Sequence, residues 1–253
     1  MHAVGEGSKF APGDKVFALS SSYISGALPG TYAAFATLKE EWLAPAPTSV
    51  SLAHAAAVPL VALTALQCLE KAAPKPGQRV LVTGASGGVG HVTVQLAKAL
   101  FGLHVVASCS PKHDAWMQEL GAEAVSHYTE GIEASLAPFS AAESQFDIIV
   151  DVVGGALLDY AVAHCLKPGG FVSEVMNRGT DHALCEGYAA SSAFGYAATL
   201  VQPSGAQLVK LAGLMDAGQL RVKVALEMPL EKAGEAQDVV IDGHAGGKVL
   251  LIV

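Results

Sequence analysis

A short run of small residues, Ala85 to Gly90, has a spacing suited to holding a pyrophosphate. It follows the pattern Ala-x-Gly-x-x-Gly, with Ala85, Gly87 and Gly90 at the three defining positions. Small residues there let the backbone turn sharply and approach a charged group closely, and the first amides of a following helix then face the negative charge. The chemistry that this spacing predicts is the binding of a dinucleotide.

A second group of polar residues follows the next predicted strand. Sites selective for NAD place Asp or Glu at the end of this strand to accept hydrogen bonds from the ribose 2′-hydroxyl, but here the first acid is Asp114. Ser110 and Tyr128 offer hydroxyl donors to a 2′-phosphate instead, and Lys112 offers a positive charge. The missing acid favours NADPH over NADH as the cofactor.

The elements that must position these residues alternate between strands and helices. Apolar residues recur at helical spacing from Val89 to Leu100, which predicts a helix directly after the glycine turn. Short apolar runs predict buried parallel strands at Val80–Val82, Val105–Ala107, Phe146–Val153 and, after a turn at Lys167–Gly170, Phe171–Ser173. This alternation predicts right-handed βαβ units and a doubly wound parallel sheet, the Rossmann-type α/β fold.

The two ends of the chain differ from the middle because they contain more strand-like segments. Strands are predicted within Phe10–Ala18, Gly30–Thr37 and Gly247–Val253, and a helix is predicted over Leu208–Met215. The sequence therefore predicts two domains. Residues 1–60 and 200–253 form a β-rich domain, and residues 61–199 form the dinucleotide-binding domain.

Composition narrows the class of protein. The 253 residues are 51% hydrophobic and carry a formal net charge of −8, which argues against a nucleic-acid surface. The longest apolar stretch, Ala53–Leu69, contains His54, Pro59 and Gln67, so it predicts a buried helix rather than a membrane span. The four cysteines form no Cys-x-x-Cys pair, so no metal site is expected. A cytoplasmic or organellar soluble compartment with reduced thiols fits this composition.

Several separate blocks together resemble the zinc-independent medium-chain dehydrogenases/reductases of the quinone oxidoreductase type. They occur in the family's order and cover nearly the whole chain: Pro12–Val16, Gly30–Ala33, Ala55–Pro59, Leu63–Ala65, Ala85–Gly90, Leu120–Ala122, Asp151–Gly155, Leu166–Gly170 and Gly247–Val249. The resemblance implies a GroES-like catalytic domain, a Rossmann domain and NADPH as the cofactor.

The resemblance also implies which residues contact the cofactor. By position these are Thr64, Ser86, Gly87, Gly88, Val89, Gly90, Ser110, Lys112 and Tyr128. Thr64 is expected near the nicotinamide, the run 86–90 at the pyrophosphate, and the last three residues at the 2′-phosphate. The family's basic residue commonly falls one position after Lys112, where this chain has His113. No catalytic side chain is assigned, although Tyr23 and Tyr32 are candidate residues of the substrate pocket.

The resemblance begins part-way through the catalytic domain. Several strands that precede the equivalent of Val4–Gly7 in the family have no counterpart here, so this domain is expected to be a partial barrel with exposed strand edges. The partners that this implies are a covering chain at the barrel or a second copy in a homodimer, for which the segment Ala189–Val201 offers apolar residues.

The activity that the resemblance implies is hydride transfer from NADPH to a small-molecule acceptor. The acceptor would be a quinone or the β-carbon of an α,β-unsaturated carbonyl. Two alternatives stay open, an enoyl-thioester reductase and a non-catalytic NADPH-binding scaffold subunit.

Overall fold

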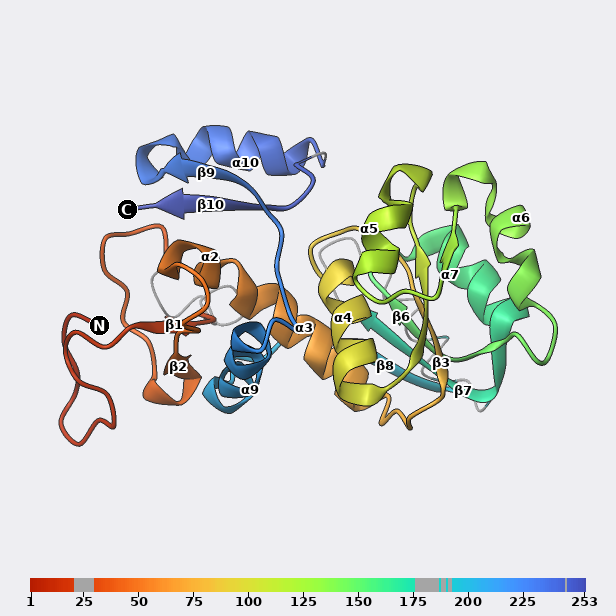
Figure 1. The fold of residues 1–253 in the computed structure, drawn as a ribbon, viewed down its shortest axis with the longest axis horizontal. Coiled ribbons are helices and arrows are strands. Elements are labelled where there is room, and N and C mark those ends of the chain that lie inside the picture. The colour runs from red at the N-terminus through yellow and green to blue at the C-terminus, as the bar shows by residue number, and fades with distance from the viewer. Residues whose placement is uncertain (21–29, 176–186, 188–189, 191–192, 244) are drawn as a thin grey trace. The chain divides into compact units, whose positions relative to one another are not determined.

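The computed structural model describes residues 1–20, 30–175, 187, 190, 193–243 and 245–253 (Figure 1). The chain divides into two compact units. One unit is formed by Thr64–Leu200, and the other by Met1–Leu63 together with Val201–Val253. Each unit contains its own sheets.

The unit of residues 64–200 is built on a six-stranded parallel sheet with the order β5-β4-β3-β6-β7-β8. Its strands are β3 (Arg79–Val82), β4 (His104–Ser108), β5 (Ala124–Ser126), β6 (Phe146–Asp151), β7 (Leu166–Val175) and β8 (Gly195–Thr199). From β3 the chain winds outward through β4 to β5, then returns to β6 and winds the other way to β8. The doubly wound α/β fold predicted from the sequence is confirmed.

Helices connect these strands, and Figure 1 shows α4 and α7 on opposite sides of the sheet. The helices and turns of this unit are α4 (Gly90–Phe101), η2 (Pro111–His113), α5 (Asp114–Glu119), η3 (Tyr128–Glu130), α6 (Ile132–Leu136), η4 (Ala137–Phe139), α7 (Gly155–Tyr160) and the π-helical turn η5 (Ala161–Cys165). Helix α4 ends at Gly102, whose φ of 61° gives the left-handed cap that glycine adopts at no steric cost. The apolar stripe predicted after the glycine turn therefore forms a helix of twelve residues.

Strand β7 differs from the expectation of a turn followed by a short strand. It runs for ten residues and continues through Lys167–Gly170, where its register against β6 shifts. Gly169 has a φ of 73°. A Cβ on Gly170 would lie 2.7 Å from Leu166 Cδ1 and 3.0 Å from the Asp147 carbonyl oxygen. The two glycines thus let the strand continue irregularly where side chains would have ended it.

The other unit contains two small sheets, of which one pairs β1 with β2 in antiparallel fashion and the other pairs β9 with β10 in parallel. Its elements are β1 (Val16–Ala18), η1 (Glu40–Trp42), β2 (Leu43–Pro45), α2 (Leu52–Ala56), α9 (Gly205–Asp216), β9 (Val224–Pro229), η6 (Leu230–Lys232), α10 (Ala233–Ile241) and β10 (Lys248–Ile252). Helix α3 (Val58–Lys71) begins in this unit and ends in the other. No helix among the described residues is long and apolar enough to cross a bilayer.

Two local predictions in this unit were wrong. Residues 30–37 form no regular structure, and Tyr32 and Phe35 are 58% and 70% exposed. Aromatic residues favour strands only where a neighbouring strand completes the ladder, and no described strand pairs with this segment. The single helix expected over 53–69 is divided into α2 and α3. Pro59 stands at the second position of α3, where its missing N–H needs no partner.

Candidate functional site

The glycine turn lies at the carboxyl end of β3, where the winding of the sheet reverses between β3 and β6. Open α/β sheets bind their ligands at this switch point. The turn is fastened to the next strand because the Ala85 N–H donates to the Ser108 carbonyl at 3.0 Å. It also closes on itself, since the Gly87 N–H donates to the Gly84 carbonyl at 2.9 Å.

Helix α4 begins directly against this turn. A Cβ on Gly90 would lie 2.3 Å from the Gly84 oxygen and 2.7 Å from Ala85 Cα, so only glycine allows the approach. Within the described part of the chain, the backbone N–H groups of Gly88, Val89 and Gly90 make no hydrogen bond. They are the free donors of a helix start. This cradle of small residues and free amides fits a pyrophosphate.

The carboxyl ends of β4 and β5 carry the residues expected at a 2′-phosphate. These ends lie side by side, because Ser108 is paired with Ser126 in the ladder. Ser110 follows β4, Lys112 lies in η2, and Tyr128 opens η3 after β5. Among the residues that the structure describes, none of these three side chains has a hydrogen bond or an ion pair. Their donors are therefore available to a ligand.

The first acid after β4, Asp114, is engaged with another side chain. His127 Nε2 lies 2.8 and 2.9 Å from its two carboxylate oxygens. Sequence reasoning missed His127, and the only signal that could have shown it is its position next to Tyr128, directly after β5.

The cysteine directly after β4 is also affected by its surroundings. Burial, and in second place the Asp114 charge, raises the pKa of the Cys109 thiol to about 11.

The predicted cofactor residues fall into two places in the structure. Ser86 and the run 87–90 form the turn and the start of α4, and the three residues predicted at the 2′-phosphate follow the neighbouring strands. Thr64 lies apart from both groups in the sequence, in the middle of α3, and is 3% exposed. Its position beside a nicotinamide stays a prediction.

A buried carboxylate that the sequence reasoning did not single out joins the ends of β3 and β6. Thr83 Oγ1 donates to Asp151 Oδ1 at 2.5 Å and accepts from the Val152 N–H at 3.0 Å. The Gly154 N–H donates to Asp151 Oδ2 at 2.7 Å. Asp151, which is 1% exposed, stands opposite Glu174 in the ladder. It therefore positions the strand end from which the glycine turn starts.

Burial and then the neighbouring Glu174 charge raise the pKa of Asp151, although hydrogen bonds from Thr83 and Gly154 lower it in part. Because the pKa is higher in the folded than in the unfolded chain, the folded state is favoured while Asp151 is protonated. This contribution is fully present below the ordinary value of 3.8 and is lost as the pH rises through the raised pKa.

Replacing Asp151 with asparagine is expected to remove this pH dependence, since the amide cannot ionise. Urea unfolding across acidic to neutral pH should show the free energy of unfolding of the wild type falling relative to Asp151→Asn. The variant Glu174→Gln should show a weaker fall than the wild type, because one cause of the raised pKa is gone. If the free energies of unfolding of the wild type and of Asp151→Asn changed with pH in parallel, the raised pKa of Asp151 would be contradicted.

A metal centre and a substrate pocket were also sought among the described residues. These residues contain no group of three or more His, Cys, Asp or Glu side chains that could hold a metal ion. A cavity of about 260 Å³ lies in the unit that holds both chain ends, and its lining residues are Tyr32, Ala236, Gln237, Val240, Ile241, Val249 and Leu251. The other pocket candidate, Tyr23, is outside the described residues, as is part of the segment 189–201.

Comparison with known proteins identifies the family. Residues 120–251 match the family model described as zinc-binding dehydrogenase. The chain is 32% identical over 255 residues to the chloroplast envelope quinone oxidoreductase homolog of Arabidopsis thaliana, covering 98% of this chain and 75% of that one. It is 31% identical over 268 residues to the mitochondrial NAD(P)H oxidoreductase RTN4IP1 of Mus musculus, covering 96% of this chain and 65% of that one.

Two further similarities agree with this result. The chain is 29% identical over 225 residues to the 2-methylene-furan-3-one reductase of Solanum lycopersicum, covering 88% of this chain and 52% of that one. The solved quinone oxidoreductase from Coxiella burnetii superposes with a TM-score of 0.74 at 31% identity, covering 83% of this chain and 64% of that one. The chain thus spans from about half to three quarters of the length of these relatives. It belongs to the zinc-binding dehydrogenase family, as a medium-chain dehydrogenase/reductase of the quinone oxidoreductase type, an oxidoreductase family that uses a nicotinamide cofactor.

Proposed function

We propose that this chain binds NADPH and transfers a hydride to a quinone or to the β-carbon of an α,β-unsaturated carbonyl. The observation that carries the proposal is a row of free hydrogen-bond donors at the carboxyl ends of β3, β4 and β5. It runs from the amides of Gly88, Val89 and Gly90 to the side chains that follow β4 and β5. Its first part suits a pyrophosphate, and its second part suits a 2′-phosphate.

The proposed preference for NADPH rests on the donors and on the acid near them. An NAD site would present a free carboxylate to the ribose 2′-hydroxyl. Here Asp114 is tied to His127, while the Lys112 ammonium has no partner among the described residues. A 2′-phosphate would therefore meet hydroxyl donors and a positive charge.

The proposed acceptor class rests on the chemistry named in the relatives. Two of them are named for quinones, and 2-methylene-furan-3-one carries a C=C bond conjugated to a carbonyl. When bound, the cofactor would supply a hydride from nicotinamide C4, and a proton from solvent would complete the reduction. The residues of this chain would bind and orient the cofactor: the turn would hold the pyrophosphate, and the hydrogen bond from Thr83 to Asp151 joins the ends of β3 and β6 next to the turn.

The proposal is tested by cofactor binding and by turnover. Titration of the full chain with NADPH and NADH should show tighter binding of NADPH. NADPH absorbance should then fall steadily when a quinone or a 2-alkenal is added. Consumption of NADPH only with a crotonyl thioester would identify an enoyl-thioester reductase instead. Binding without turnover of any acceptor would support the scaffold alternative, and equal affinity for the two cofactors would overturn the preference for NADPH.

Replacing Lys112 with alanine is expected to weaken NADPH binding about tenfold, because a hydrogen bond to a charged group is lost. NADH, which lacks the 2′-phosphate, should bind as before. Lys75→Ala, an exposed lysine that precedes the amino end of β3, is the matched control for loss of one positive charge. Isothermal titration of each variant with both cofactors gives the comparison. A parallel loss of NADH affinity, or an equal loss in the control, would contradict the assignment.

A further inference from the structure

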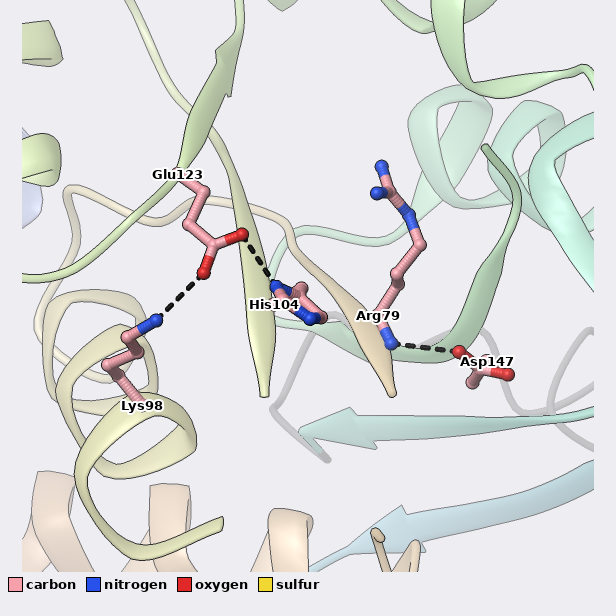
Figure 2. Close-up of polar contacts among 5 residues, drawn as sticks. All are labelled: Arg79, Lys98, His104, Glu123 and Asp147. Carbon is pink, nitrogen blue, oxygen red and sulfur yellow. Dashed lines mark hydrogen bonds and ion pairs between the residues drawn. The ribbon is translucent and has the colours of Figure 1, made fainter. Parts of the chain in front are cut away.

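Strands β4 and β5 carry a histidine–carboxylate pair at each end. At the amino ends, His104 Nδ1 lies 2.7 Å from Glu123 Oε2, and Lys98 Nζ lies 2.7 Å from Oε1 of the same carboxylate (Figure 2). At the carboxyl ends, His127 Nε2 lies 2.8 and 2.9 Å from the Asp114 oxygens. The second pair is the more shielded, since the His127 side chain is 23% exposed and that of His104 is 52% exposed.

His127 lies between two carboxylates. Its Nε2 contacts Asp114, and its Nδ1 lies 3.5 Å from Glu130 Oε1. A histidine ring has a nitrogen on each side, so one side chain can reach a different carboxylate with each of them. His127 thus contacts both acids.

These two acids lie close in sequence to the residues proposed at the 2′-phosphate. Asp114 begins α5 two positions after Lys112, and Glu130 ends η3 two positions after Tyr128. A free carboxylate at this end of the sheet would repel a phosphate and accept a hydrogen bond from a ribose hydroxyl. Whether Asp114 and Glu130 are free or engaged by another side chain therefore bears on which cofactor is accepted.

We propose that His127 is a positioning residue that determines coenzyme preference. By contacting Asp114 through Nε2 and Glu130 through Nδ1, it engages their carboxylates and keeps them away from Ser110, Lys112 and Tyr128, so that these three residues accept a 2′-phosphate. The inference rests on the proposed NADPH site and deepens it. Coenzyme selectivity then depends partly on a side chain that contacts the neighbouring acids and does not itself contact the phosphate.

The test compares cofactor affinities of four variants of the full chain. His127→Ala leaves Asp114 without its partner and should weaken NADPH binding about fivefold at low salt, with NADH unchanged or tighter. The deficit should shrink as ionic strength rises. Adding Asp114→Asn to His127→Ala should restore most of the NADPH affinity. His127→Lys, which places a cation beside the two acids, should retain the preference. His104→Ala breaks the corresponding pair at the opposite end of β4 and should leave the ratio of affinities as in the wild type.

Thermal unfolding shows which variants are folded. If His127→Ala is not folded, His127→Lys and the double variant provide the test. Weaker binding of both cofactors to the same extent, a deficit insensitive to salt, or no restoration in the double variant would each overturn the inference. The two proposals fail differently. If the wild type binds NADPH and NADH equally, the NADPH site is overturned. If the wild type prefers NADPH and His127→Ala keeps the same preference, only the role of His127 is overturned.

Discussion

Gly90→Ala is expected to weaken NADPH binding about 100-fold and to lower the free energy of unfolding by about 3 kcal/mol. The added Cβ would lie 2.3 Å from the Gly84 oxygen and 2.7 Å from Ala85 Cα, and both are backbone atoms that cannot rotate away. The start of α4 must therefore move, and the amides of the turn move with it. Loss of about two hydrogen bonds to a charged group gives the stated fall in affinity, and overpacking against backbone gives the stated loss of stability.

Fluorescence titration with NADPH and urea unfolding measure the two effects of this substitution. Gly213→Ala is the matched control, because it adds the same methyl group within α9, where nothing lies within 4 Å of the new Cβ. In Gly213→Ala the free energy of unfolding should rise by up to about 1 kcal/mol, because alanine has the higher helix propensity. This variant should bind NADPH as the wild type does. If Gly90→Ala kept wild-type affinity, the turn could not be the pyrophosphate site.

Phe146→Ala is expected to cost about 3–5 kcal/mol of unfolding free energy, the range for removing a buried aromatic side chain. Phe146 begins β6, is 0% exposed and belongs to a core to which the central strands of the sheet and the helices α6 and α7 contribute. Its ring centroid lies 5.2 Å from that of Phe139, and Arg79 lies over the same ring. The backbone of Arg79 is in turn fixed by the Asp147 carboxylate at 2.8 Å, as Figure 2 shows.

Urea unfolding followed by circular dichroism measures this loss of stability. Phe139→Ala is the control, since that ring packs against the same core but is only partly buried. It should cost distinctly less than Phe146→Ala, because less apolar surface leaves water when it folds. Equal losses for the two variants would mean that Phe146 is not the centre of this core.

The central sheet and the turn were predictable because their signals are local. Apolar runs give the buried strands, and the spacing from Ala85 to Gly90 gives the turn. In the unit that holds both chain ends the signals were weaker. The segment 30–37 has the composition of a strand, but a strand also needs a neighbour to pair with, which composition does not show.

The polar contacts around the turn could not be predicted, because they depend on strand order and register. Thr83 and Asp151 are 68 residues apart in sequence and meet only because β6 adds beside β3. Asp114 and His127 meet because β5 adds beside β4. Each residue alone is an ordinary polar side chain after a strand, so its role becomes visible only when the partner strand is placed.

The shortness of β5 has a consequence for how coenzyme preference can change. This strand has three residues, stands at the edge of the sheet and, among the strands that the structure describes, pairs with β4 alone. The residues proposed to select the 2′-phosphate follow these two strands, whereas the turn and Asp151 belong to the central pair of β3 and β6. Substitutions at the outermost strand therefore leave the pyrophosphate cradle and the main core in place. In evolution, a switch between the two nicotinamide coenzymes could proceed at this edge without rebuilding the rest of the fold.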